Sequence, residues 1–206
     1  MSSNGVNFPN RQVPANATYL RSTFYEQLVE HVFISEVLQE AWYGFGQTVE
    51  VLRSEIDASG YDVVFECNGI VRHVQLKTSA FNAKASRQKV NIALAVKPSG
   101  CVVWIVRHED HKSARMTLSY RFFGGTPGSC LPDVERFPIA KHTKGDAAGT
   151  KKERPNIRVV PKRDFVPVAT TKALIERLFG VMPPIDNQAL AVIQASIDSD
   201  EDSSNV

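Results

Sequence analysis

Three side chains with the chemistry to act on a charged substrate lie around one predicted turn. Asn68-Gly69 is a strong signal for a two-residue β-hairpin turn, and it separates Asp62 from Gln75 and Lys77. A two-residue turn sets the register of its hairpin, which predicts that Asp62 pairs with Gln75. Paired residues share a face with Cβ atoms about 4.5–5.5 Å apart, and Lys77 projects from that face too. The pattern therefore predicts a carboxylate, an amide oxygen and an ammonium group in one cluster.

The residues between these three positions are apolar and should point into the core from the opposite face: Val63, Phe65, Val74 and Leu76. A lysine on a half-buried central strand is unusual. The simpler alternative is a surface salt bridge between Asp62 and Lys77 on an exposed sheet face. His73 shares the predicted face, either as an aid to proton transfer or, more commonly for a lone histidine, as a packing residue.

An additional acid is expected from the predicted helix over residues 22–42. On a helical wheel Glu30 falls at the centre of an apolar sector. A carboxylate there needs a partner or a metal ion, unless it extends outward to solvent. Glu26, one turn earlier, is the substitute candidate. The residues that form the apolar sector are Phe33, Ile34, Val37, Leu38 and Ala41.

These motifs resemble a known superfamily. Gly60-Tyr61-Asp62, followed thirteen positions after Asp62 by Gln75-Leu76-Lys77, is similar to the core motif of PD-(D/E)XK nucleases. The closest likeness is to the variant in which glutamine replaces the second acid, within a plan shared by Holliday-junction resolvases and Mrr-like restriction nucleases. The resemblance covers about residues 24–106. Two positions depart from the pattern: no proline precedes Asp62, and Gln75 removes one negative charge from the metal site.

The resemblance implies an α/β fold with a restriction-endonuclease-like core, in which helices flank a mixed central sheet of at least four strands. It also implies a metal-dependent nuclease that hydrolyses phosphodiester bonds, with DNA as the favoured substrate. Asp62, Gln75 and Glu30 would bind Mg²⁺ or Mn²⁺, and Lys77 would stabilise charge on the phosphate. Asp57, ahead of Glu55, is a further candidate metal ligand. The alternatives are a nucleic-acid-binding subunit with little or no activity, and an unrelated α/β protein in which the motif occurs by chance.

Two basic stretches are candidates for contact with nucleic acid. Ser79, Lys84, Arg87 and Lys89 follow the predicted catalytic strand, and a longer basic segment covers residues 140–163. Such contacts give affinity that falls with salt and carry no base preference. The alternative is an ordinary solvated face. The candidates in the longer segment are Lys141, Lys144, Lys151, Lys152 and Arg154.

Turn signals and apolar periodicity define the remaining elements. We expect strands over 48–53, 61–67, 70–77, 90–96, 101–106, 116–123 and 157–160, and a last helix from Thr170 or Thr171 through Phe179. A short helix is the alternative for residues 90–96. The apolar run 101–106 suits a central, fully covered strand.

Length and composition predict one domain over residues 18–182, after a flexible arm over 1–17 and before a disordered acidic tail over 183–206. The net charge is +2, with four acids and no base between Asp198 and Asp202. Three scattered cysteines predict free thiols in a reduced, cytoplasmic protein. No segment predicts a membrane partner. A homodimer is one assembly that the sequence leaves open.

Overall fold

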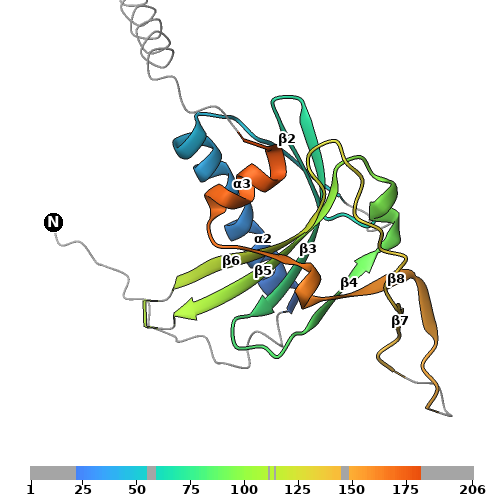
Figure 1. The fold of residues 1–206 in the computed structure, drawn as a ribbon. Helices are drawn as coiled ribbons and strands as arrows, with labels where there is room; N and C mark the ends of the chain where they lie inside the picture. The colour runs from blue at the N-terminus through green and yellow to red at the C-terminus, as the bar shows by residue number, and fades with distance from the viewer. Residues whose placement is uncertain (1–21, 55–58, 111, 114, 145–148, 182–206) are drawn as a thin grey trace, which may run out of the picture.

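The computed structural model describes residues 22–54, 59–110, 112–113, 115–144 and 149–181 (Figure 1). The predicted arm and acidic tail, as well as Asp57, lie outside the described residues. The helices are α2 (Ser22–Gln39), the π-helix η1 (Glu40–Gly44), the 3₁₀ helices η2 (Ile92–Val96) and η3 (Lys162–Asp164), and α3 (Thr171–Phe179). The strands are β1 (Glu50–Arg53), β2 (Val63–Cys67), β3 (Ile70–Ala80), β4 (Arg87–Asn91), β5 (Gly100–Asp110), β6 (Arg115–Gly124), β7 (Ile139–Lys141), β8 (Glu153–Pro161) and β9 (Val166–Val168).

The protein is an α/β fold built on a mixed six-stranded sheet in the order β1-β2-β3-β5-β6-β9. Strands β3 and β5 run parallel, and the other neighbouring pairs are antiparallel. The mixed sheet of at least four strands is therefore confirmed. The apolar strand β5 lies inside this sheet, where residues 101–105 are buried from both faces.

The Asn68-Gly69 turn has the geometry that its sequence predicts. Both residues have positive φ, at 51° and 77°, as a type I′ hairpin turn requires. The ladder pairs Cys67 with Ile70 and continues without a slip to Val63 opposite Val74. The predicted register is confirmed over this whole stretch.

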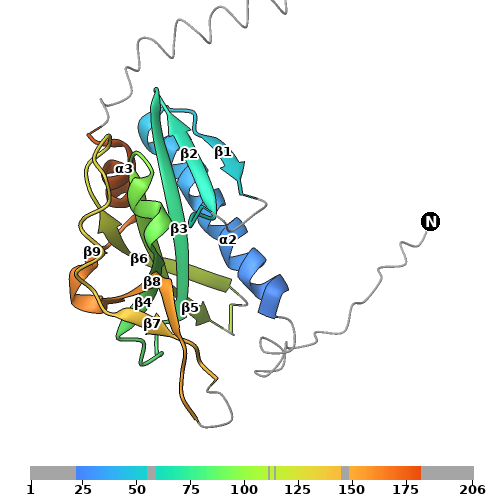
Figure 2. The ribbon, with the colours of Figure 1, turned by 90° about the vertical axis from the view of Figure 1, so that its right-hand side faces the viewer.

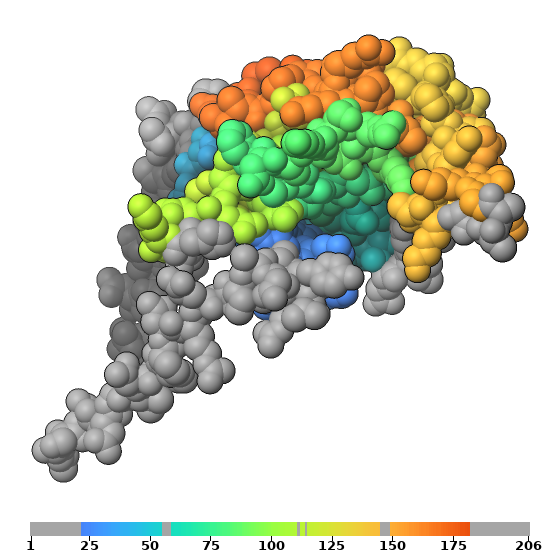
Figure 3. All heavy atoms as spheres, turned by 90° about the horizontal axis from the view of Figure 1, so that it is seen from below, coloured from blue at the N-terminus to red at the C-terminus, as the bar shows by residue number. Residues whose placement is uncertain are grey.

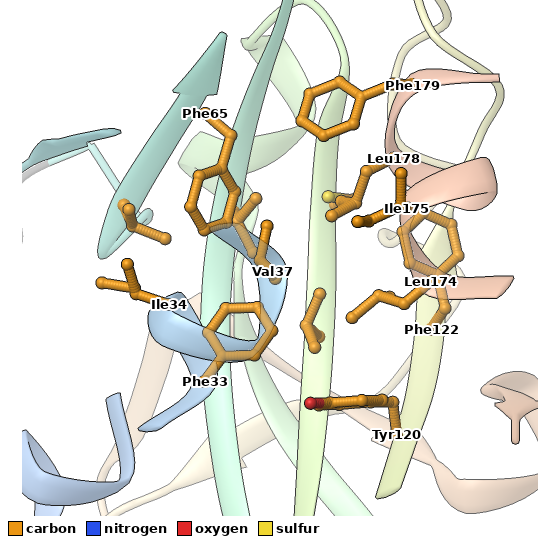
Figure 4. Close-up of a cluster of buried hydrophobic side chains, with 14 of the residues drawn as sticks. Phe33, Ile34, Val37, Phe65, Tyr120, Phe122, Leu174, Ile175, Leu178 and Phe179 are labelled. Atoms are coloured by element: carbon orange, nitrogen blue, oxygen red, sulfur yellow. The ribbon is translucent and has the colours of Figure 1, made fainter. Parts of the chain in front are cut away.

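Helices α2 and α3 cover one face of the large sheet and enclose the main core (Figure 4). Phe33 lies at the centre of this core and makes edge-to-face contacts with Phe65 of β2 and Tyr120 of β6. The last helix begins as predicted, because the Thr170 hydroxyl accepts a hydrogen bond from the Ala173 amide at 3.1 Å. Gly180 closes the helix with a φ of 84°.

A second sheet of three strands, in the order β4-β8-β7, covers the opposite face. Val90 and Val160 from this sheet pack with Val102 and Trp104 of β5 in a second apolar cluster. Strands β7 and β8 continue outward from this cluster as a hairpin that projects away from the body of the protein (Figures 1 and 2). The protein thus has three layers: two helices, the large sheet, and the small sheet.

The predicted strand over residues 90–96 is only partly correct. Strand β4 ends at Asn91, whose side-chain oxygen accepts a hydrogen bond from the Ala93 amide at 3.0 Å and so caps the 3₁₀ helix η2. The short strands β7 and β9 have no clear periodicity and were not expected. Among the described residues, no helix is long and apolar enough to cross a membrane.

Candidate functional site

Asp62 stands where strand β2 begins, and its carboxylate reaches the backbone of β3. The Asp62 amide donates to the Val74 carbonyl at 2.9 Å, and Asp62 Oδ2 accepts a hydrogen bond from the Leu76 amide at 2.6 Å. Leu76 lies between Gln75 and Lys77 in sequence. The structure therefore brings the carboxylate beside the β3 segment that carries the other two predicted residues. The predicted pair of Asp62 with Gln75 is not part of the regular ladder, which ends with Val63 opposite Val74.

Gln75 is almost fully buried, with 5% of its surface exposed. Its side-chain oxygen accepts a hydrogen bond from the Asn91 amide at 3.3 Å, which ties β3 to the end of β4. A buried polar side chain needs such a partner, and this contact also orients the amide oxygen. Asn91 was not identified from the sequence, because nothing local marks a residue sixteen positions away as the partner of Gln75.

The glycine turn before Asp62 is held by the same asparagine. Gly60 has a φ of 75°, and a Cβ at this position would lie 2.9 Å from Asn91 Cβ. Only glycine avoids both the backbone strain and the clash. The asparagine side chain thus packs against the turn that delivers Asp62, while its amide holds Gln75.

Lys77 and Ser79 lie on the same side of β3 as Gln75, paired with Trp104 and Val106 of the parallel strand β5. Lys77 is partly buried. The Ser79 hydroxyl accepts a hydrogen bond from the Trp104 indole at 2.9 Å. Ser79 therefore has a structural partner in addition to the substrate contact predicted for it.

The structure gives the helix acid a different partner from the one predicted. Glu30 on α2 forms an ion pair with Arg53 of β1 at 3.2 Å, and the arginine is about half exposed. Glu26 is exposed on the same helix. Among the described residues, no group of three or more His, Cys, Asp or Glu side chains is close enough together to hold a metal ion. Glu30 thus joins no metal-binding cluster there.

The oxygen donors that are present fit a hard divalent cation with few protein ligands. Asp62 offers a carboxylate and Gln75 an amide oxygen, and hydrogen bonds from backbone amides hold both groups. Mg²⁺ commonly binds through one or two carboxylates and keeps several waters, whereas soft metals prefer sulfur and imidazole. This donor set suits Mg²⁺ or Mn²⁺ and does not suit zinc.

His73 has the contacts of a packing residue. Its Nδ1 lies 3.0 Å from the Pro98 carbonyl oxygen, and its ring meets the Tyr61 ring edge-on at 5.0 Å between centroids. The ammonium group of Lys97 lies over the Tyr61 ring, 5.5 Å from its centroid. These contacts favour the structural alternative for His73.

The two basic stretches of the sequence meet in the small sheet. Arg87 and Lys89 stand on β4, which pairs with β8, and β8 pairs in turn with β7. Seen from below, the yellow-to-orange residues, which include β7 and β8, lie at one side of the molecule and extend beyond the green residues (Figure 3). Of the predicted nucleic-acid contacts, Ser79 is partly buried. The others are all exposed: Lys84, Arg87, Lys89, Lys141, Lys144, Lys151, Lys152 and Arg154.

Two open cavities border the small sheet. One, of about 520 Å³, lies between η2 and the segment 133–135 and is lined by Asn91, Asp133 and Glu135. The other, of about 600 Å³, is lined by Arg87, Arg136 and Arg163. Asn91 links the first cavity to Gln75. Neither cavity is lined by any of the four predicted catalytic residues, Asp62, Gln75, Lys77 and Glu30.

Comparisons with known proteins add no family assignment to this geometry. No protein-family model, no curated protein and no solved structure matches the chain.

Proposed function

We propose that the protein is a metal-dependent nuclease of the PD-(D/E)XK type that acts on DNA. The observation that carries this proposal is the contact of Asp62 Oδ2 with the Leu76 amide at 2.6 Å. It sets a carboxylate beside the strand segment that presents Gln75 and Lys77. The confirmed hairpin register, together with the glycine turn before Asp62, agrees with the motif on which the resemblance is based.

Each residue of the cluster has a role that its chemistry supports. Asp62 and the Gln75 amide oxygen would hold Mg²⁺ or Mn²⁺, which when bound supplies Lewis-acid assistance to phosphodiester hydrolysis. The Lys77 ammonium group would stabilise the negative charge that develops on the attacked phosphate. Asn91 would keep the Gln75 oxygen oriented, and the exposed cations of the small sheet would attract the nucleic acid.

A nuclease assay on the full chain tests this proposal. We expect Mg²⁺- or Mn²⁺-dependent cleavage of plasmid or linear duplex that EDTA abolishes. Replacing Lys77 with Met keeps the aliphatic stem, so the fold should survive while the rate falls at least a hundredfold, about 2.7 kcal/mol of transition-state stabilisation. Lys112→Met, at an exposed position between β5 and β6, is the matched control and should cleave as the parent does.

The second candidate function is nucleic-acid binding without cleavage. It is favoured by the ion pair of Glu30 with Arg53, which leaves one acid, Asp62, at the cluster among the described residues. A parent protein that binds duplex but cleaves none with either ion would establish this alternative and contradict the nuclease proposal. Equal cleavage by the parent and by Lys77→Met would contradict the assigned role of the lysine.

A further inference from the structure

A cavity of about 600 Å³ on the small sheet is rich in arginine. Its charged lining consists of Arg87, Arg136 and Arg163, opposed by the carboxylate of Asp164. Three cations against one anion leave it net positive. Guanidinium groups are planar forks that match the oxygens of a phosphate group, often through two hydrogen bonds.

The carboxylate lies beside two of the arginines. Asp164 Oδ1 lies 3.2 Å from Arg136 Nη2, and Asp164 Oδ2 lies 3.7 Å from Arg163 Nε. The Arg136 guanidinium also lies over the Phe137 ring, 4.7 Å from its centroid. Phe137 in turn packs edge-on against Phe123 of the second core cluster. Since a guanidinium has five N–H donors, the contacts of Arg136 orient its guanidinium and leave donors for a ligand.

Arg87 lines the cavity from β4, the strand that pairs with β8. It is exposed, and among the described residues no carboxylate forms an ion pair with it. Arg87 stands four residues before Asn91 on β4, which corresponds to about 13 Å along the strand. Asn91 contacts Gln75 directly. At a rise of about 3.4 Å per base pair, the separation of Arg87 from Asn91 corresponds to roughly four base pairs.

We propose that this cavity binds a backbone phosphate of a DNA duplex, a few base pairs from the bond that is cleaved. The proposal rests on the proposed function, because the nearby cluster supplies the reason for a nucleic acid to lie there. It assigns substrate-binding roles to Arg163, at the end of the basic segment over residues 140–163, and to Arg136, which lies outside both basic stretches. Strand β4 carries both Arg87, which would contact the phosphate, and Asn91, which contacts Gln75.

The test is equilibrium binding of a labelled DNA duplex to the full chain in EDTA, so that cleavage plays no part. The double variant Arg87→Gln/Arg163→Gln keeps the ion pair of Arg136 with Asp164 and should remain folded by thermal melting. We expect its dissociation constant to rise by on the order of tenfold or more. The slope of log affinity against log salt should fall in magnitude by about one.

The control makes the same charge change at exposed arginines elsewhere, Arg115→Gln/Arg177→Gln, which should leave affinity and slope unchanged. A double variant that binds duplex with the parent affinity and slope would overturn the phosphate site, even if the parent cleaves DNA. Loss of binding in the double variant would support the site, even if no nuclease activity is found. If the double variant lost affinity for ATP but not for duplex, the phosphate would come from a free nucleotide, and the proposal would be overturned.

Discussion

At the residue scale, the most unusual side chain of the protein is Arg72 on β3. It is fully buried, and it lies in the main core rather than in the candidate site. Its Nη2 donates to the Gly125 carbonyl at 3.1 Å, and its guanidinium lies 5.6 Å from the Phe122 ring centroid. Among the described residues it has no carboxylate partner, and its Nε and Nη1 atoms have no hydrogen-bond partner.

A buried charge without an opposite charge costs several kcal/mol, even where a carbonyl and an aromatic ring offset part of that cost. We therefore expect Arg72→Met, which keeps a long apolar side chain, to raise the free energy of unfolding by about 1–4 kcal/mol. Urea unfolding of the parent and the variant measures this change. Arg177→Met on the exposed side of α3 is the control. A destabilised Arg72→Met variant would show that the guanidinium has a favourable interaction beyond those described.

Asn91, also at the residue scale, makes three contacts around the candidate site. Its backbone amide, side-chain oxygen and Cβ contact Gln75, the η2 helix and Gly60 respectively. A single asparagine thus joins the turn that carries Asp62 to the amide that would share its metal ion. The candidate site depends on this residue as much as on the motif itself.

At the scale of elements, a hydrogen-bond cluster connects α2, β6 and α3. The Tyr120 hydroxyl donates to Glu36 Oε2, and the Thr171 hydroxyl donates to the same oxygen at 3.2 Å. Burial of the phenol, and next its hydrogen bond to Glu36, raise the pKa of Tyr120 well above its ordinary value of 10.0. The Tyr120 contact therefore ties α2 to the sheet only while the phenol stays protonated.

A raised folded-state pKa gives a contribution to stability that is fully present below pH 10 and is lost as the pH rises further. We expect Tyr120→Phe to lower the free energy of unfolding at pH 7 by about 1–3 kcal/mol, since Glu36 loses a donor. The variant should also show a shallower loss of stability above pH 10. The residual slope includes Tyr25, whose pKa burial and Glu109 raise to about 12.

Urea unfolding at intervals from pH 7 to pH 11 would measure both effects. Tyr43→Phe, at a position that is 78% exposed, should match the parent at every pH. Parallel stability profiles for the parent and Tyr120→Phe above pH 10 would contradict the role assigned to the phenol.

At the scale of the whole molecule, the helical layer and the small sheet differ in charge, and each covers one of the two apolar clusters. Helix α2 carries Glu26, Glu30 and Glu36, and Glu40 follows in η1, whereas the small sheet carries the exposed cations. Such a separation of charge favours approach of a polyanion to the small sheet. The central strand β5 lies beneath both clusters and is protected by both layers.

This layering predicts how the three thiols react. Cys67 and Cys101 are buried, and desolvation raises the pKa of both, that of Cys101 to about 11. Cys130 is exposed. Because the thiolate is the reactive form, a thiol reagent should modify one equivalent rapidly in the native protein and three after unfolding in denaturant.

Spectroscopic titration with a disulfide reagent gives these counts directly. In a Cys130→Ser variant the rapid phase should disappear, while the other two thiols react only as fast as the protein unfolds. If two or more thiols of the native parent reacted rapidly, the layers would have to separate locally and expose Cys67 or Cys101.

The hairpin and its register, from Cys67 opposite Ile70 to Val63 opposite Val74, are properties of the sequence itself, because a two-residue Asn-Gly turn acts locally on the two strands that it joins. The last helix follows from a capping threonine for the same local reason, and apolar periodicity indicates most of the strands, whereas the mixed sheet is expected only from the resemblance. What only the tertiary structure decided are the partners that are distant in the chain. They include Asn91 for Gln75, Arg53 for Glu30, and β8 for β4, more than sixty residues away. Such contacts form because two layers bury apolar surface against one sheet, and no local pattern specifies which polar side chains that burial brings together.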